Sequence, residues 1–437
     1  MSPEPTTVVL SPPPTPNGPL HLGHLAGPYV AADVAARALR LRGERVLSVC
    51  GLDDHQNYVL ARARQQDAEA RPVRDHYASL IRGVFDRLRV THDVFVEPAA
   101  DPAYRNAVVR FLGELVGSGA VTVEEWAAPA CPSCPGTLHH AYVSGTCACC
   151  GAGSGGGTCE GCGSYTPADE LADPVCTRCG RAATASRRTT GPVLRLEDHR
   201  DALEAFWCRA VLPDRVRAMI ARLQARPMPV VPLTYETDWG IEYPGGQRID
   251  VWAEMGLGYL HSIGRRFAPR SPALADHVAA WRHVDAVWAF MGLDNAFYYS
   301  VLFPALYAAA GLPLDPIAGL VVNEFYRLSG AKFSTSRDHA VWAHEFLAAN
   351  DPADVRMFLS WDRPAPEPTD FTEERFHATV AAWRGVKGLV ETSATDLRRA
   401  ETALLPGHFD PALATRCLLA ADPAESVTLM RAVTGEG

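Results

Sequence analysis

Apolar runs and a helical repeat alternate along the first part of the chain. An apolar run at 7–10 is followed by a proline-rich turn, and apolar residues then recur about once per helical turn from Val30 to Leu41. Gly43 ends this repeat, and a second apolar run follows at 46–50. A strand, a helix and a strand within so short a span form a β-α-β unit, which predicts a parallel sheet.

The remaining pattern predicts that this sheet is completed late in the chain. Residues 57–118 are expected to be mainly helical, and helical periodicity returns at 198–225. Between about 120 and 190 Cys, Gly and Pro dominate, so we expect an insertion there, and helices from the last strand to the end of the chain. Four further segments, separated by helical stretches, are expected to be strands and to form the second half of the same sheet: 230–233, 249–252, 286–290 and 320–325.

The inserted segment carries a metal-binding pattern. A tetrahedral Zn²⁺ ion takes four thiolates, and one C-x-x-C turn supplies two of them, so four such turns predict two closed, structural zinc sites. Zinc would also stabilise a segment with few apolar residues, whereas the alternative is a chance cluster of buried thiols. The shortest loop pairs the second turn with the third and leaves the first with the fourth, which is one of the possible pairings. The turns are Cys131/Cys134, Cys147/Cys150, Cys159/Cys162 and Cys176/Cys179.

Composition narrows the class of protein. The 437 residues are 47% hydrophobic with a net charge of −9, which excludes long-range disorder and a surface that binds nucleic acid all over. Every long apolar run is broken by a charge, Pro or Gly, and the N-terminus has no basic start, so we expect neither a membrane span nor a signal peptide, and a cytoplasmic protein. Only Lys332 and Lys387 are lysines among 41 basic residues, which suggests that arginine would not serve at these positions.

His21-Leu-Gly23-His24 follows the first apolar run and opens the predicted helix. A helix N-terminus favours phosphate, and two imidazoles one turn apart can stabilise charge on a transferring phosphoryl group. Gly23 would let a flat base approach the backbone closely. Two surface histidines, or half of a metal site, are the alternatives to this nucleotide site.

Two further motifs lie beside the predicted strands. Asp53-Asp54-His55 ends the second strand, where open α/β sheets bind ligands, and a carboxylate there could accept hydrogen bonds from a substrate ammonium or cap a helix. Lys332 lies in a polar loop after the last strand, where its ammonium could neutralise a departing pyrophosphate. The alternative is that this segment is an exposed polar loop without a role in binding. The scarcity of lysine in the chain favours a functional role for Lys332.

These motifs, in this order, resemble the class I aminoacyl-tRNA synthetases, and among them the methionyl-tRNA synthetases. His21 to His24 matches the "HIGH" signature, residues 332–336 resemble the "KMSKS" loop, and Asp238-Trp-Gly-Ile241 looks like the segment that re-enters the catalytic fold. The resemblance runs from about residue 7 to residue 390. It implies an α/β fold in which a Rossmann-like parallel sheet is split by a zinc-binding connective insertion and is followed by a helical C-terminal region.

The resemblance also implies an organisation along the chain. The expected parts are a first catalytic half, the insertion with its zinc knuckles, a second catalytic half, the KMSKS-like loop with stem-contact helices, and a truncated helical tail, at 1–118, 119–229, 230–325, 326–395 and 396–437. An anticodon-binding helix bundle would need more residues than the tail provides. We therefore expect tRNA to be a possible partner without anticodon recognition, and the protein to be a monomer.

Carried over residue by residue, the resemblance implies that the protein forms aminoacyl-AMP and pyrophosphate from an amino acid and Mg²⁺·ATP, with structural Zn²⁺. His21, His24 and Lys332 would be the catalytic residues, and Asp53 would hold the ammonium of the amino acid. The implied ATP-binding residues are Asn17, Gly23, Asp294, Ser334 and Ser336. The implied amino-acid-binding residues are Pro13, Thr15, Asp53, Tyr235, Trp252, Tyr259 and Tyr299.

Several positions depart from the pattern of the family. Pro13, Thr15, Tyr235 and Tyr299 stand where the family has Leu, Tyr, Arg and His, which favours an amino acid other than methionine. Thr335 replaces the second lysine of the loop. The acceptor stays open between the 3′ end of a tRNA and a non-tRNA acceptor such as an amine or a carrier protein. A nucleotidylyltransferase and a non-catalytic regulator are the alternatives from other classes.

Overall fold

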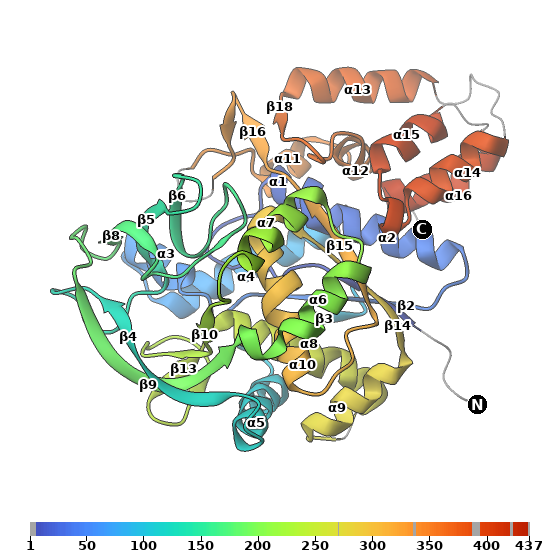
Figure 1. Ribbon diagram of the computed structural model, residues 1–437. Coiled ribbons are helices and arrows are strands. Elements are labelled where there is room, and N and C mark those ends of the chain that lie inside the picture. The colour runs from blue at the N-terminus through green and yellow to red at the C-terminus, as the bar shows by residue number, and fades with distance from the viewer. Residues whose placement is uncertain (1–5, 270, 335–337, 387–393, 420–422, 436–437) are drawn as a thin grey trace.

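A computed structural model describes residues 6–269, 271–334, 338–386, 394–419 and 423–435 (Figure 1). Its centre is a parallel sheet with the strand order β15-β14-β1-β2-β3. The order reverses between β1 and β14, as in a Rossmann-like fold. The predicted parallel sheet is thus confirmed, with strands β1 (Thr6–Leu10), β2 (Val46–Gly51), β3 (Val94–Val96), β14 (Val284–Gly292) and β15 (Ile317–Asn323).

Helices cover both faces of this sheet, which explains why every residue of β1 is buried. Val8 and Leu10 belong to the larger core, which also contains residues of α5 (Pro102–Gly117) and α8 (Val251–Phe267). Val9, which points to the other face, packs in a cluster with the alanines of α2 (Val30–Leu41). A parallel strand buried on both faces shows a continuous apolar run and no alternation.

Two of the four later segments lie outside the parallel sheet, so that part of the prediction is wrong. β10 (Val230–Pro232) pairs antiparallel with β9 (Ala185–Arg195) of the insertion. The segment at 249–252 is divided between β13 (Gln247–Ile249) and helix α8. β13 belongs to a small antiparallel sheet with β11 (Thr234–Tyr235) and β12 (Glu242–Tyr243). Asp250 ends the strand because its carboxylate accepts hydrogen bonds from the backbone N–H groups of Trp252 and Ala253 and so caps α8.

The insertion is built of short antiparallel strands and lies at one end of the molecule, on the left of Figure 1. Its two sheets have the orders β10-β9-β4 and β7-β6-β5-β8. The strands not yet given are β4 (Thr122–Ala130), β5 (His140–Cys147), β6 (Gly153–Thr158), β7 (Tyr165–Thr166) and β8 (Leu171–Cys176). The predicted helical stretch that follows is confirmed as α6 (Arg200–Arg209) and α7 (Asp214–Gln224).

The remaining elements surround the sheet and form the C-terminal part. A short helix α1 (Leu22–His24) and a π-helical turn, η1 (Leu25–Tyr29), precede α2, and a short 3₁₀ helix, η4 (Leu293–Asn295), follows β14. The polar loop predicted around Lys332 is instead a hairpin of β16 (Tyr326–Leu328) and β17 (Ala331–Lys332), joined by β18 (Thr369–Phe371). The other helices are α3 (Tyr58–Gln65), α4 (Ala70–Leu88), α9 (Leu274–Ala280), α10 (Phe303–Ala309), α11 (Ala343–Ala349), α12 (Pro352–Trp361), α13 (Glu373–Val386), α14 (Ala394–Ala403), α15 (Pro411–Leu419) and α16 (Pro423–Thr434).

The sequence predicts that no segment spans a membrane. Within the described ranges, no helix combines the length and the apolar character needed to cross a bilayer.

Candidate active site

Four of the predicted site residues follow four neighbouring strands of the parallel sheet. His21 follows β1, Asp53 follows β2, Asp294 follows β14 and Lys332 follows β15. The carboxyl ends of parallel strands lie at one edge of the sheet, and a crevice forms there where the strand order reverses. The reversal between β1 and β14 therefore brings residues distant in sequence to one crevice.

The two imidazoles of the His21–His24 motif cap their own helix. The backbone N–H of His24 donates to Nδ1 of His21 and the backbone N–H of His21 donates to Nδ1 of His24, each over 3.2 Å. The rings stack with centroids 3.6 Å apart. Burial lowers the pKa of both imidazoles, that of His24 to about 4 with the Lys332 ammonium acting in the same direction. Both rings are therefore neutral near pH 7 and carry their proton on Nε2, where it can be donated to a ligand.

Gly23 is required by its neighbours. A Cβ atom at this position would lie 3.1 Å from Nδ1 of His21 and 3.2 Å from Cβ of Tyr326. The ring of Phe333, next to Lys332, meets the His21 ring edge-on at 5.3 Å. The β16–β17 hairpin thus packs directly on the histidine motif, and a larger residue at position 23 would push it away.

Lys332 brings a positive charge to the histidines. Its Nζ atom lies 2.6 Å from a carboxylate oxygen of Glu160 and 3.7 Å from the ring centroid of Phe325. After burial, its charge further lowers the pKa of His21 and His24, and it opposes the rise in the pKa of Asp294 that burial causes. The ammonium is therefore part of the same crevice and is held there by a residue of the insertion.

The residues expected at the nucleotide are only partly brought together. Asp294 lies half-buried on η4, where burial raises the pKa of its carboxyl and Asn295 donates to it over 3.2 Å. The backbone N–H of Ser334 donates to the carbonyl of His339 over 2.9 Å, in an isolated bridge that follows the hairpin. The backbone carbonyl of Asn17 accepts from Arg62 over 2.7 Å. Ser336 lies outside the described residues.

Asp53 offers a carboxylate oxygen to a ligand. The hydroxyl of Thr15 donates to its Oδ2 over 2.8 Å, and its buried Oδ1 has no hydrogen-bond partner among the residues that the structure describes. Burial raises the pKa of Asp53 to about 7. The adjacent Asp54 is saturated, because both of its oxygens accept from Arg74 at 2.7 Å. Of these two carboxylates, Asp53 is thus the one that has an oxygen left to accept a further hydrogen bond within the described residues.

Two of the expected pocket residues pair with each other. The hydroxyls of Tyr259 and Tyr299 lie 2.6 Å apart, and Tyr259 donates to the carbonyl of Ser11 over 3.1 Å. Both side chains are buried. Their polar atoms are therefore satisfied within the protein. Pro13 is half-buried. The carbonyl of its neighbour Pro14 accepts a hydrogen bond from the backbone N–H of Asp53 over 3.0 Å.

Trp252 and Tyr235 form a separate group. The Trp252 ring stacks on Tyr298 with centroids 3.5 Å apart, and the Tyr235 ring stacks on His139 at 4.3 Å. All four line a cavity of about 410 Å³ between the insertion and the catalytic sheet. Asp53, Tyr259 and Tyr299 do not line this cavity, but the charge of Asp53 acts on His140, which does, so the expected amino-acid-binding residues lie beside the cavity as well as in it.

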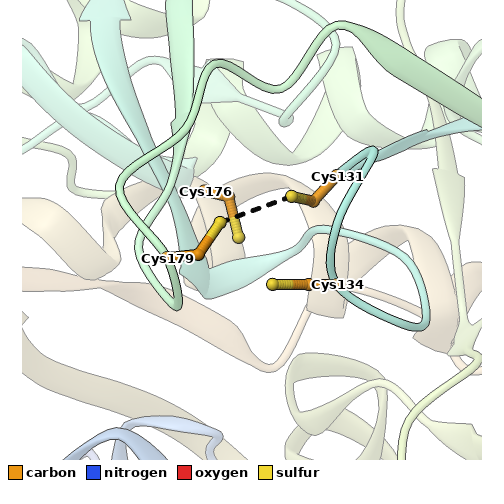
Figure 2. A group of neighbouring side chains, drawn as sticks. All are labelled: Cys131, Cys134, Cys176 and Cys179. Carbon is orange, nitrogen blue, oxygen red and sulfur yellow. Dashed lines mark hydrogen bonds between the residues drawn. The ribbon is translucent and has the colours of Figure 1, made fainter.

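The eight paired cysteines form two groups of four, as the spacing predicts. Within each group the sulfur atoms all lie within 4.8 Å of one another. Figure 2 shows the outer group, in which the sulfurs of Cys131 and Cys179 are 3.5 Å apart. Tetrahedral Zn–S bonds of about 2.3 Å require sulfur separations of about 3.8 Å, so both donor sets fit zinc. The groups are Cys131, Cys134, Cys176 and Cys179, and Cys147, Cys150, Cys159 and Cys162.

Comparison with known proteins identifies the family. The model of the family described as "tRNA synthetases class I (M)" matches residues 7–382. The chain belongs to this synthetase family. Among curated relatives, the methionine–tRNA ligases of Pyrococcus furiosus and Thermococcus kodakarensis are 30% and 32% identical to it. Each alignment covers 83% of this chain but only 52% and 51% of the relative, so the chain spans about half the length of the curated relatives it matches.

A solved synthetase structure has the same fold. The Mycobacterium tuberculosis methionyl-tRNA synthetase in complex with methionyl-adenylate matches with a TM-score of 0.72, over 95% of this chain and 82% of that chain. Because the sequence identity is 16%, this likeness concerns the fold alone.

Sequence reasoning missed the polar contacts that hold the synthetase site together. His140 of the insertion contacts Asp250, the cap of α8, over 2.5 Å, and His55 contacts Glu254 over 2.9 Å. Burial alone would lower the pKa of His140, but the Asp250 carboxylate raises it. Glu160, the partner of Lys332, was also missed. Each pair joins distant segments, so no local pattern could have revealed it.

Proposed function

We propose that the protein activates an amino acid with ATP and forms aminoacyl-AMP and pyrophosphate. One observation carries this proposal: two neutral imidazoles, the Lys332 ammonium and the partly unpartnered Asp53 carboxylate lie along one edge of the sheet. This set can hold a polyphosphate and an ammonium together. Membership of the synthetase family supports the same reaction.

In this reaction the carboxylate of the amino acid attacks the α-phosphorus of ATP. The bond between the α-phosphorus and the bridging oxygen breaks, and pyrophosphate leaves with the electron pair. His21 and His24 would donate hydrogen bonds from Nε2 to the phosphates, and Lys332 would neutralise the leaving group. No protein nucleophile is needed, because such transfers depend on positioning and charge stabilisation. Asp294 would bind the ribose, and Mg²⁺ would neutralise phosphate charge.

The amino acid is proposed to be one other than methionine. The hydroxyls of Tyr259 and Tyr299 already have partners within the protein, because they contact each other, the carbonyl of Ser11 and, over 3.7 Å, the sulfur of Met255, so neither is left for a substrate side chain. Thr15 donates directly to Asp53 at the ammonium site, where the family resemblance implies a tyrosine. These contacts support a pocket of different shape and polarity from that of a methionine enzyme.

The proposed acceptor is the 3′ end of a tRNA, since the curated relatives are methionine–tRNA ligases. A non-tRNA amine or carrier protein is the second acceptor class. Two zinc ions are proposed to bind the two cysteine groups and to fix the fold of the insertion.

Amino-acid-dependent exchange of labelled pyrophosphate into ATP, measured across a full amino-acid panel, tests the activation step. We expect exchange with at least one amino acid and a weak response to methionine. The proposal is refuted if none of the amino acids supports exchange. Exchange that occurs when all amino acids are left out would indicate a nucleotidylyltransferase. Transfer of a labelled amino acid to total tRNA then tests the tRNA acceptor, and activation without such transfer would favour the non-tRNA acceptor class.

A further inference from the structure

The contact between Glu160 and Lys332 joins the zinc knuckle to the proposed ATP site. Glu160 lies between Cys159 and Cys162, two members of one cysteine group, and its carboxylate is 2.6 Å from Nζ of Lys332. Lys332 stands at the end of β17, on the hairpin that packs against the His21 ring. A carboxylate of the insertion thus meets the cation that the proposed reaction needs for pyrophosphate.

The turn that carries Glu160 is anchored from helix α7. Arg215 donates to the carbonyl of Gly161 over 2.7 Å, and Arg222 donates to the carbonyl of Cys162 over 2.8 Å. Within the turn, the N–H of Gly163 donates to the carbonyl of Cys159 over 2.7 Å. The backbone position of Glu160 is therefore set by the knuckle and by α7, so the carboxylate is held at the crevice.

The negative charge of Glu160 reaches the nucleotide-binding side of the crevice. Burial is the first cause of the raised pKa of the Asp294 carboxyl, and the charge of Glu160 raises that pKa further. Asp294 is the residue that we place at the ribose. The Glu160 carboxylate thus places a negative charge next to Lys332, beside Asp294, as a phosphate of bound ATP would.

We propose that Glu160 neutralises Lys332 in the free protein and that the phosphates of ATP displace it when they bind. This inference rests on the proposed function of the site. Glu160 and Lys332 have 59% and 29% of their side chains exposed, so solvent screens the pair. Exposed pairs of this kind contribute little free energy, which allows ATP to exchange with the carboxylate. The pair thus occupies the lysine in the free protein without closing the site.

The first test measures ATP binding directly, by calorimetry with a non-hydrolysable ATP analogue and Mg²⁺ in the absence of amino acid. Glu160→Gln should lower the Kd about two- to fivefold, because the analogue no longer competes with a carboxylate for Lys332. In pyrophosphate exchange, KM for ATP should fall while kcat stays unchanged, since Glu160 is already displaced in the transition state. Glu170→Gln is the matched control, because Glu170 belongs to the insertion and pairs with Arg226 at 3.1 Å.

The second test places Glu160→Gln in a Lys332→Ala background. If Glu160 acts through Lys332, the Kd for the analogue will be the same in the single Lys332→Ala variant and in the double variant. An equal gain in both backgrounds would show that Glu160 merely repels phosphate, and a Glu160→Gln variant that binds like wild type or like Glu170→Gln would also overturn the inference. Zinc content is measured alongside to show that the knuckle is intact. A wild-type protein that binds no ATP would instead refute the proposed function.

Discussion

Neighbouring carboxylates have opposite environments at the proposed ammonium site. Asp54 is fully paired with Arg74, whereas Oδ1 of Asp53 is buried with no hydrogen-bond partner in the described part of the chain. A buried, incompletely paired carboxylate is unfavourable for folding unless a ligand compensates it. The contrast explains why Asp53 is the residue available to a substrate cation.

Replacing Asp53 should therefore separate stability from activity. Asp53→Asn should raise the amino-acid KM about 10- to 100-fold, because a charge-assisted hydrogen bond is lost. The raised pKa means that Asp53 favours folding below its unfolded pKa and that this contribution is lost as the pH rises through about 7. The variant should thus unfold at a higher temperature than wild type at pH 8, with no difference near pH 4. A variant less stable than wild type at pH 8 would contradict this account.

The same carboxyl predicts a pH dependence of substrate binding. An ammonium needs the ionised form of Asp53, whose pKa is about 7 in the free protein. The amino-acid KM should therefore rise about tenfold for each pH unit below 7 and level off above it. Exchange kinetics between pH 5.5 and 8.5 measure this profile. Asp53→Asn provides the control, since its KM should not vary with pH over this range.

Lys332 tests whether charge alone is sufficient at the pyrophosphate position. Lys332→Ala should reduce the rate of pyrophosphate exchange about 100- to 1000-fold, the usual cost of removing one donor to transition-state charge. Lys332→Arg should also lose at least about tenfold, because a planar guanidinium cannot replace a compact ammonium against Phe325 and Glu160. An arginine variant with full activity would refute the argument from the scarcity of lysine.

At the scale of residues, the sequence identifies candidate site side chains better than it identifies the residues that contact them. The histidine motif, Asp53 and Lys332 could be selected from local pattern and family resemblance, and the structure places them at one sheet edge. The saturation of Asp54 and the contact of Lys332 with Glu160 could not be predicted, because each depends on how distant segments pack.

At the scale of elements, predictability follows the length and the surroundings of each segment. Most residues of β1, β2 and β14 are buried, and each strand is rich in apolar residues. β3 has three residues and was missed, since so short a strand carries no periodic signal. The segment at 249–252 is misleading, because the cap formed by Asp250 converts its end into a helix. The secondary structure of these two segments therefore depends on helix capping and on pairing with distant strands, which the local sequence does not show.

The cysteine groups provide the prediction at this scale. Cys147→Ser should remove about one equivalent of bound zinc and lower the melting temperature, because three thiolates hold the ion less tightly than four. Cys149→Ser is the matched control, since this exposed neighbour belongs to neither group. Zinc content by atomic absorption and thermal unfolding measure both effects. Equal zinc in the two variants would contradict the assignment of Cys147.

At the scale of the whole molecule, the insertion contacts the catalytic part through charged pairs. His140 meets the cap of α8, and Glu160 meets Lys332 on the hairpin beyond β15. Figure 1 shows the insertion beside the sheet and the C-terminal helices at the opposite end. Zinc binding would thus stabilise a unit that also sets side chains at the crevice.

The central claim is that the triphosphate of ATP lies at the carboxyl edge of the split sheet, between the two histidines and Lys332. A crystal structure with a non-hydrolysable ATP analogue tests it most directly. We expect phosphate oxygens within hydrogen-bond distance of Nε2 of His24 and of Nζ of Lys332, with Glu160 no longer paired with the lysine. An analogue bound elsewhere, or a crevice left empty at saturating concentration, would contradict the account.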